Sequence, residues 1–358
     1  MTSRFETLWQ HLPKSIDGAI IQSDVNRRYF TGMPSSAGTL VIFREAAYLI
    51  IDFRYIEKAR ATVTSCEVIE QNHLYSQMEE LIREHGAKTM AIESMELHVS
   101  EYHALQNALR AVTTLDDSDT LSRAIYDCRT VKSDEELEKI EAAQAIAEKA
   151  FEDILNYIAP GRTEWDIMMR LNQTMLEEGS DGESFPTIAL TGSATSMPHG
   201  VPSRNRIVEK GDFVLMDYGA TVDGYHSDMT RTVCVGQPSD KMRTVYETVL
   251  KAQTTAIQAA APGISGRTLD GVARSIIENA GYGETFGHSL GHGVGLEIHE
   301  YPNAAPSVQT LLAPGNVVTV EPGIYLAGEF GVRIEDFVAI TQTGCRNLTK
   351  APKQLITL

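Results

Sequence analysis

Two stretches of the chain, Gly211-Asp-Phe-Val-Leu-Met-Asp217-Tyr-Gly219 and Gly315-Asn-Val-Val-Thr-Val-Glu321-Pro-Gly323, share one pattern. Each stretch begins and ends with glycine and carries an acid two residues before its last glycine. Because side chains alternate faces along a strand, each acid shares a face with the residue two positions before it. An acid that faces the interior of an apolar strand is costly unless a cation or a donor meets it. The pattern therefore predicts two equivalent strands, each directed at a polar site.

A second pair of acids follows the first. Gly224-Tyr-His-Ser-Asp228 matches Gly331-Val-Arg-Ile-Glu335, so an acid recurs at the same place in each of two predicted β-hairpins. His226 and Arg333 occupy matching positions in these segments. The four acids together with one histidine predict a dinuclear metal centre. Its candidate ligands are Asp217, Asp228, His292, Glu321 and Glu335.

The duplication extends beyond the acids. Ala-Pro-Gly ends one helical pattern at Gly161 and another at Gly263, and an Arg-Thr pair follows each of them. We expect these pairs to open new helices, with Thr163 and Thr268 as N-caps. Gly-Glu-Ser-Phe at 182–185 likewise corresponds to Gly-Glu-Thr-Phe at 283–286. A period of roughly a hundred residues is too long for a solenoid and indicates two related half-domains, with the site at their junction.

The first third of the chain has a different pattern. Short apolar runs at 19–22, 39–43 and 48–51 predict buried strands, and residues 74–86 and 98–112 predict helices between further strands. This alternation indicates an α/β domain with its own core. A capping box, Ser133 to Glu136, starts a long helix after it. From this change of pattern we predict domains at 1–125 and 126–358.

Composition narrows the class of protein. The 358 residues are enough for two domains, and 42% hydrophobic with 22% charged residues is ordinary for a soluble globular enzyme. A net charge of −17 argues against nucleic-acid binding, which needs a basic surface. The four cysteines form no metal or redox motif, which favours reduced thiols in the cytoplasm. The N-terminus lacks the apolar run of a signal peptide, and no apolar stretch approaches membrane-spanning length, so we expect no membrane partner.

The motifs resemble a known family, the "pita-bread" metallopeptidases, which include aminopeptidase P, prolidase and methionine aminopeptidase. The motifs that carry the resemblance are Met216-Asp217-Tyr-Gly with Asp228, Gly287-His288-Ser-Leu-Gly-His292-Gly-Val-Gly, Ile298-His299-Glu300, Glu321-Pro-Gly-Ile-Tyr and Val332-Arg333-Ile-Glu335-Asp336. The resemblance covers essentially the whole chain. It implies an α/β (α+β) fold, in which a creatinase-like N-terminal α/β domain precedes a pseudo-symmetric pita-bread catalytic domain.

The resemblance also implies how the metal ligands divide. Asp217 would chelate one metal, His292 and Glu321 would hold the other, and Asp228 and Glu335 would bridge the two. Four carboxylates and one imidazole form an oxygen-rich set, which suits Mn²⁺, Co²⁺, Fe²⁺ or Zn²⁺ better than a soft metal. We expect two divalent ions, with Mn²⁺ first. Two such ions can share a bridging water, lower its pKa and polarise a substrate carbonyl.

Further catalytic candidates come from the same resemblance. His199, in Ser196-Met-Pro-His-Gly, would hydrogen-bond the scissile amide nitrogen or pass a proton to the leaving amine. His288 and His299 would line the substrate side, with His299 stabilising the oxyanion. Glu321 would accept the proton of the attacking water, unless a bridging hydroxide needs no separate base. Arg333 is expected to orient the carboxylates.

These expectations favour an exopeptidase that removes an N-terminal residue preceding proline, from Xaa-Pro dipeptides or short peptides. Methionine aminopeptidase shares all five ligands but resembles only the second domain. Creatinase has the leading domain but lacks the full ligand set. A non-catalytic module that binds peptides or proteins on the same fold is the alternative from another class. The expected partners are a peptide with proline at its second position and, by resemblance, a second copy of the chain in a homodimer.

Overall fold

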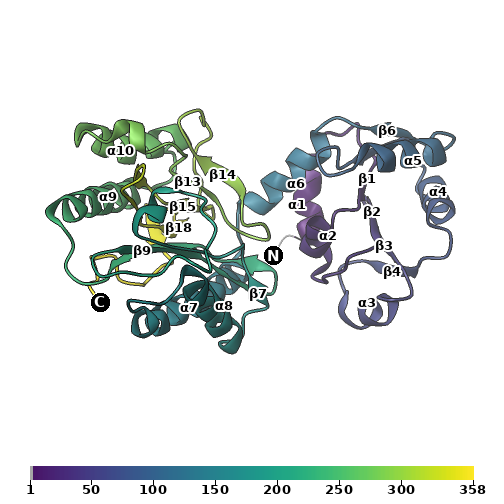
Figure 1. Ribbon diagram of the computed structural model, residues 1–358. Helices are drawn as coiled ribbons and strands as arrows, with labels where there is room; N and C mark the ends of the chain where they lie inside the picture. The colour runs from purple at the N-terminus through teal and green to yellow at the C-terminus, as the bar shows by residue number, and fades with distance from the viewer. Residues whose placement is uncertain (1–2) are drawn as a thin grey trace. The chain divides into compact units, whose positions relative to one another are not determined.

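The computed structural model describes residues 3–358 and forms two compact units (Figure 1). The first unit ends at Arg129, and the second runs from Thr130 to Leu358. Met1 and Thr2, which begin the stretch expected to lack a signal peptide, lie outside the described residues. No helix within residues 3–358 is both long and apolar enough to cross a bilayer.

The first unit is a mixed six-stranded sheet in the order β4-β3-β2-β1-β5-β6. The central strand β1 pairs antiparallel with β2 and parallel with β5. The strands are β1 (Gly18–Ile21), β2 (Thr39–Phe43), β3 (Ala47–Ile51), β4 (Glu67–Glu70), β5 (Thr89–Ile92) and β6 (Thr114–Asp116). The helices are α1 (Arg4–His11), α2 (Asp24–Thr31), α3 (Ile56–Thr62), α4 (Leu74–Glu84), α5 (Val99–Leu109) and α6 (Thr120–Thr130). The expected α/β fold of this region is confirmed.

The core of the first unit explains why the apolar runs became strands. β1 and β2 are buried along their whole length, and their β-branched and aliphatic side chains suit a covered sheet. Helices α4 and α5 pack Met78, Ile82 and Leu105 onto this sheet. Helix α4 ends before Gly86, whose φ of +63° is a conformation that glycine adopts without strain.

The second unit contains two halves, residues 134–234 and 240–340, each with two helices and a strand pair. The first half has α7 (Asp134–Tyr157), α8 (Glu164–Glu177), β7 (Gly182–Glu183), β8 (Ile188–Thr191), the 3₁₀ turn η1 (Gly192–Ser196), β9 (Phe213–Tyr218), β10 (Ala220–Val222), β11 (Tyr225–His226) and β12 (Met229–Cys234). The second has α9 (Asp240–Ala259), α10 (Gly266–Asn279), η2 (Gly283–Thr285), β13 (Gly291–Gly293), β14 (Glu300–Ala304), β15 (Val317–Val320), β16 (Gly323–Leu326), β17 (Phe330–Arg333) and β18 (Asp336–Ile340), followed by β19 (Cys345–Asn347).

The predicted duplication is visible in the strand pairing. β9 pairs antiparallel with β12, and the short hairpin β10–β11 lies between them in the chain. β15 pairs with β18 in the same way, with the hairpin β16–β17 between them. Figure 1 places α9 and α10 on one side of β9, β15 and β18, and α7 and α8 on the other. Each helix pair covers the strands of its own half, so the strands of the second unit lie between two helical layers. The pita-bread domain is confirmed.

Two details of the predicted repeat differ. Thr163 is the N-cap of α8, as expected, but the N-cap of α10 is Ser265 and not Thr268. Ser265 Oγ accepts a hydrogen bond from the backbone nitrogen of Thr268, which therefore lies inside the first turn. The matching segments at 182–185 and 283–286 also fold differently, the first as strand β7 and the second as η2.

Candidate metal centre and active site

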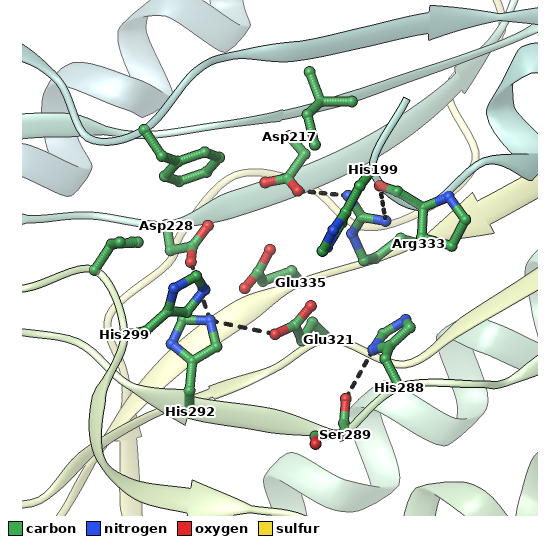
Figure 2. A pocket seen from close by; sticks show the side chains of 14 residues that line it. His199, Asp217, Asp228, His288, Ser289, His292, His299, Glu321, Arg333 and Glu335 are labelled. Carbon is green, nitrogen blue, oxygen red and sulfur yellow. Dashed lines mark hydrogen bonds and ion pairs between the residues drawn. The ribbon is translucent and has the colours of Figure 1, made fainter. Parts of the chain in front are cut away.

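The two strand pairs bring four carboxylates to one place. Asp217 is in β9, Asp228 directly precedes β12, Glu321 directly follows β15 and Glu335 directly precedes β18. Figure 2 shows these side chains directed toward one another, with His292 of β13 beside them. Each acid lies at or beside the end of a strand, where the chain enters or leaves the short hairpin. The paired strands therefore hold the acids near one another. Residues far apart in the sequence thus form a single cluster.

His292 faces this cluster with one ring nitrogen. Its Nε2 lies 3.5 Å from Asp228 Oδ2 and 3.4 Å from Glu321 Oε1. Its Nδ1 donates to the carbonyl of Gly293 at 3.0 Å, because a carbonyl oxygen can only accept. Burial lowers the pKa of His292 to about 4, so the imidazole is neutral at neutral pH with its Nε2 lone pair directed at the acids. This is the protonation state in which histidine binds a metal.

Burial and mutual repulsion disfavour the charged forms of the carboxylates. Burial raises the pKa of Asp228 and of Glu335 well above the usual range, and the neighbouring acids add to the rise. Burial also raises the pKa of Glu321 to about 8. Clustered buried acids are costly as anions unless cations meet them, so this cluster has the electrostatics of a cation site.

Unsatisfied oxygen atoms point to the same conclusion. Asp217 Oδ1 and Glu335 Oε1 are buried without a hydrogen-bond partner, although buried polar atoms are nearly always paired. Ligand atoms of Asp228, His292 and Glu335 lie within 4.8 Å of one another. The donor set is therefore suited to divalent cations with oxygen and imidazole ligands.

Other side chains hold the acids in place. Arg333 Nη2 donates to Asp217 Oδ2 at 2.5 Å, so the guanidinium contacts one of the four carboxylates directly. Thr230 Oγ1 donates to Glu335 Oε2 at 2.7 Å and accepts from Arg333 Nε at 3.0 Å. Thr319 Oγ1 lies 3.3 Å from Glu321 Oε1. The two threonines were not predicted, although each lies two residues from an acid and so shares its strand face.

All nine predicted site residues line one cavity of about 240 Å³. The acids and imidazoles form one part of its wall: His199, Asp217, Asp228, His288, His292, His299, Glu321, Arg333 and Glu335. The remaining lining residues, which the sequence analysis did not identify, are Phe185, Ile188, Pro198, Ser289 and Ile298. The cavity therefore combines a polar wall with apolar side chains that can receive an apolar part of a ligand.

The three histidines beside the ligands differ in their contacts. His288 Nδ1 lies 2.8 Å from the Ser289 carbonyl oxygen, and His288 Nε2 lies 2.9 Å from Tyr325 Oη. Burial lowers the pKa of His288 to about 4, so its Nε2 accepts the hydroxyl proton of Tyr325. The rings of His292 and His299 meet edge to face at 4.3 Å. His199 and Arg333 lie together beyond Asp217 (Figure 2).

Tyr325 is a further residue that the sequence analysis missed. Its hydroxyl accepts from Arg333 Nη1 at 2.8 Å and contacts His288, so it connects the imidazole to the guanidinium that holds Asp217. Burial raises the pKa of Tyr325 to about 12, which keeps the phenol protonated. Its position in Glu321-Pro-Gly-Ile-Tyr325 was the available signal.

Comparison with known proteins identifies the family of both units. Residues 138–342 match the metallopeptidase family M24, and residues 11–131 match the creatinase/prolidase N-terminal domain. The chain is 38% identical to a Xaa-Pro dipeptidase of Pyrococcus horikoshii, over 96% of this chain and 95% of that one. It is 40% identical to an uncharacterized peptidase of Bacillus subtilis, over 96% of each chain.

Solved structures of similar proteins share the fold of this chain over nearly its whole length. A Xaa-Pro dipeptidase from Bacillus anthracis superposes with a TM-score of 0.94 at 38% identity, over 99% of each chain. An X-Pro aminopeptidase from Thermotoga maritima superposes with a TM-score of 0.89 at 36% identity, over 96% of this chain and 98% of that one.

Fold, site and relatives together define a metal-dependent peptidase. The chain belongs to the metallopeptidase family M24 and carries the creatinase/prolidase N-terminal domain in front of its catalytic domain. Membership of this family implies divalent metal ions.

Proposed function

We propose that the chain is a dinuclear metal-dependent exopeptidase that cleaves the bond between an N-terminal residue and a following proline. The observation that carries the proposal is the convergence of four acids, of which Asp228 and Glu335 are buried, and one neutral imidazole on a single cavity. The substrate class is supported by relatives that are named Xaa-Pro dipeptidase and by the leading domain that this chain shares with prolidases. That domain also favours Xaa-Pro cleavage over the methionine aminopeptidase alternative.

Five residues would hold the metals. Asp217 would bind one ion, His292 and Glu321 the other, and Asp228 and Glu335 would lie between the two. When bound, the ions would supply an activated water and polarise the scissile carbonyl. We infer Mn²⁺ as the first candidate, because the set is rich in carboxylate oxygens.

The chain's own side chains would bind and orient the peptide. His199 would hydrogen-bond the scissile amide nitrogen and return a proton to the leaving amine. His299 would donate to the carbonyl oxygen as negative charge develops on it, and His288 would line the substrate side. Glu321 would accept the proton from the attacking water, and Arg333 would keep Asp217 oriented through their ion pair. The apolar side chains of Phe185, Ile188 and Ile298 would receive the proline ring.

Two further parts of the proposal concern the protein in the cell. We infer a homodimer, on family resemblance. We also infer a cytoplasmic location, which the four free cysteines support, because thiols persist in a reducing compartment.

A cleavage assay tests the function. Metal-stripped protein receives Mn²⁺, Co²⁺ or Zn²⁺ and is offered an Xaa-Pro dipeptide, a longer peptide beginning Xaa-Pro, a Met-Ala peptide and creatine. We expect mass spectrometry to detect cleavage after the first residue of the proline peptides only. Cleavage of the dipeptide alone would define a dipeptidase, and cleavage of the longer peptide an aminopeptidase. Turnover of Met-Ala alone, or of nothing with any metal, would contradict the proposal.

A further inference from the structure

A buried ion pair lies close to the site without lining its cavity. Lys132 Nζ is 2.6 Å from Glu300 Oε1, and the two side chains are only 1% and 6% exposed. Neither residue belongs to the cavity wall. Charged side chains are rarely buried so fully unless they are paired, and a buried pair is often retained to fix one conformation. The proposed function does not explain why this pair is buried here.

Glu300 closes the loop that carries two of the site's imidazoles. It follows His299 at the start of β14, and it pairs across the sheet with Gly293 of β13, the residue after His292. Residues 294–299 run between these paired positions. The two imidazole rings meet at 4.3 Å, so any shift of this loop changes where His299 points relative to the metal ligand His292.

The carboxylate of Glu300 occupies the inside of that loop. A Cβ atom added to Gly295 would lie 2.2 Å from Glu300 Oε1, so the loop passes closer than any side chain at position 295 would allow. The backbone nitrogen of Glu297 lies 3.4 Å from Glu300 Oε2. The Gly295 carbonyl accepts from the backbone nitrogen of His226 at 2.9 Å. The loop is thus built around this carboxylate.

Lys132 connects the loop to the strand that presents Glu321. Its backbone nitrogen donates to the Gly315 carbonyl at 2.8 Å, and Asn316 Nδ2 donates to the Thr130 carbonyl at 3.1 Å. A Cβ on Gly315 would lie 2.7 Å from Val131, so this contact is also close-packed. Gly315 and Asn316 lead directly into β15. The ammonium group therefore ties residues 294–299 to the start of a ligand-bearing strand.

We propose that Lys132 and Glu300 are a positioning pair that fixes the loop from His292 to His299 and thereby sets the His299 imidazole toward the substrate. This inference rests on the proposed function, in which His299 contacts the substrate carbonyl. Without Lys132 the buried carboxylate loses this cation, so turning toward water and drawing the loop with it becomes more favourable. The effect on catalysis then passes through His299.

A double-mutant cycle tests this step. The variants are Lys132→Met, His299→Ala and their combination, measured on the full chain loaded with Mn²⁺ with an Xaa-Pro dipeptide. We expect Lys132→Met to lower kcat about tenfold to a hundredfold, with KM and metal content near the wild-type values. In the His299→Ala background the same change should lower kcat less than about threefold, because residues that act together are not additive. Equal losses in both backgrounds, or no loss, would overturn the proposal.

Two variants serve as safeguards. Glu300→Gln keeps the shape of the side chain and removes its charge, so it replaces Lys132→Met in the cycle if that variant does not fold. Arg170→Met breaks a different ion pair, Arg170 Nε to Asp153 at 2.6 Å between α8 and α7, and is expected to leave kcat unchanged. A similar loss of kcat in Arg170→Met would make the effect a general consequence of losing an ion pair and would overturn the inference.

A second readout separates the inference from the proposed function. Metal-free protein labelled in histidine gives one ¹³Cε1 resonance per imidazole, and His299→Ala identifies that of His299. We expect Lys132→Met to shift the His299 resonance and leave that of His85, in the first unit, in place. If the wild type cleaves no peptide but this shift occurs, the proposed function fails and the positioning of the loop stands. An unmoved His299 resonance in a folded variant would overturn the positioning pair itself.

Discussion

The two halves of the second unit present their acids alike and differ in what faces those acids. In the first half β8 lies beside β9, with Ile188 opposite Asp217, and this side of the cavity is apolar through Phe185 and Ile188. In the second half β13 lies beside β15, and His292 donates its backbone nitrogen to Thr319 at 3.0 Å. Both halves contribute the same strand pair and its acids to the cluster, while the neighbouring segments form an apolar wall in one half and an imidazole wall in the other.

Matching positions within the hairpins have diverged as well. His226 and Arg333 each lie two residues before a predicted bridging acid, Asp228 and Glu335. Arg333 crosses to the other half and pairs with Asp217, whereas His226 Nδ1 lies 2.9 Å from Ser184 Oγ in its own half. The second half thus supplies a cation for an acid of the first half, whereas the His226 ring contacts Ser184 of its own half. The guanidinium that contacts Asp217 therefore comes from the second half alone of these two matched positions.

The largest expected effect tests whether the duplicated acids are equivalent. Asp228→Ala and Glu335→Ala should each lower kcat more than about a thousandfold and reduce bound metal, because each acid is predicted to bridge the two ions. Metal analysis by mass spectrometry and the Xaa-Pro dipeptide assay measure both quantities. Circular dichroism should show that the first unit stays folded. Retained activity in either variant would break the equivalence of the halves and the dinuclear arrangement.

The second prediction concerns how stability depends on pH when no metal neutralises the clustered acids. Without metal, Glu321 keeps its proton up to about pH 8, whereas a glutamate in the unfolded chain loses it near 4.5. The folded protein therefore binds more protons in this range, and its free energy of unfolding falls as pH rises. The total loss is on the order of several kcal/mol. The depressed pKa values of His288 and His292 act in the opposite sense, but only between about 4 and 6.5.

Thermal unfolding of chelator-treated protein between pH 6.5 and 8.5 isolates the contribution of the acids. We expect Tm to fall across this window, and to fall less in Glu321→Gln. Added Mn²⁺ should raise Tm most at the high end, because the ligands bind metal in their deprotonated form. A Tm that rises with pH in the metal-free wild type would contradict the raised pKa values.

The third prediction uses this difference between Arg333 and His226. Arg333→Met leaves Asp217 without its buried partner, and we expect kcat/KM to fall about a hundredfold, as is common when a residue that orients a metal ligand is lost. The matched change in the other half, His226→Ala, should lower kcat/KM less than about threefold, because the His226 ring contacts Ser184 of its own half. Steady-state kinetics at saturating Mn²⁺ measure both. Equal losses would mean that the two positions still have equivalent roles.

The fourth prediction concerns His199, which comes from the first half but lies among the polar groups of the cavity. His199→Ala should lower kcat about tenfold to a hundredfold while bound metal stays at the wild-type level, because the imidazole is expected to act on the amide and not on the metals. Metal analysis run beside the assay provides the control. An emptied metal site would instead place His199 among the ligands.

The acids were predictable from the sequence because strands have a strict two-residue alternation. An acid at the end of an apolar strand is unusual, and its repetition at Asp217 and Glu321 made the pattern specific. The strands of the first unit were predictable for a related reason, since β1 and β2 are continuous apolar runs. These features depend on local sequence alone.

The supporting contacts were not predictable, because they join residues that are remote in the sequence. Thr230 donates to Glu335 across 105 positions, and nothing in the neighbourhood of a lone threonine indicates such a partner. The Lys132–Glu300 pair is of the same kind. Tyr325 lay within a recognised motif, but its role depends on the tautomer of His288, which only the surrounding hydrogen bonds determine.

The smallest prediction concerns the N-cap of α10, which is Ser265 and not the expected Thr268. Thr163 and Ser265 each follow a Pro-Gly pair by the same interval, and each side chain accepts a hydrogen bond from the third residue of its helix. Thr268 resembles Thr163 only in following an arginine. Loss of a capping oxygen typically costs about 1 kcal/mol, so Thr163→Ala and Ser265→Ala should destabilise the protein by similar amounts. Thr268→Ala removes no cap and should stay within about 0.5 kcal/mol of the wild type. Urea unfolding of the three variants compares them directly, and a larger cost for Thr268→Ala than for Ser265→Ala would show that the two helices do not start in equivalent ways.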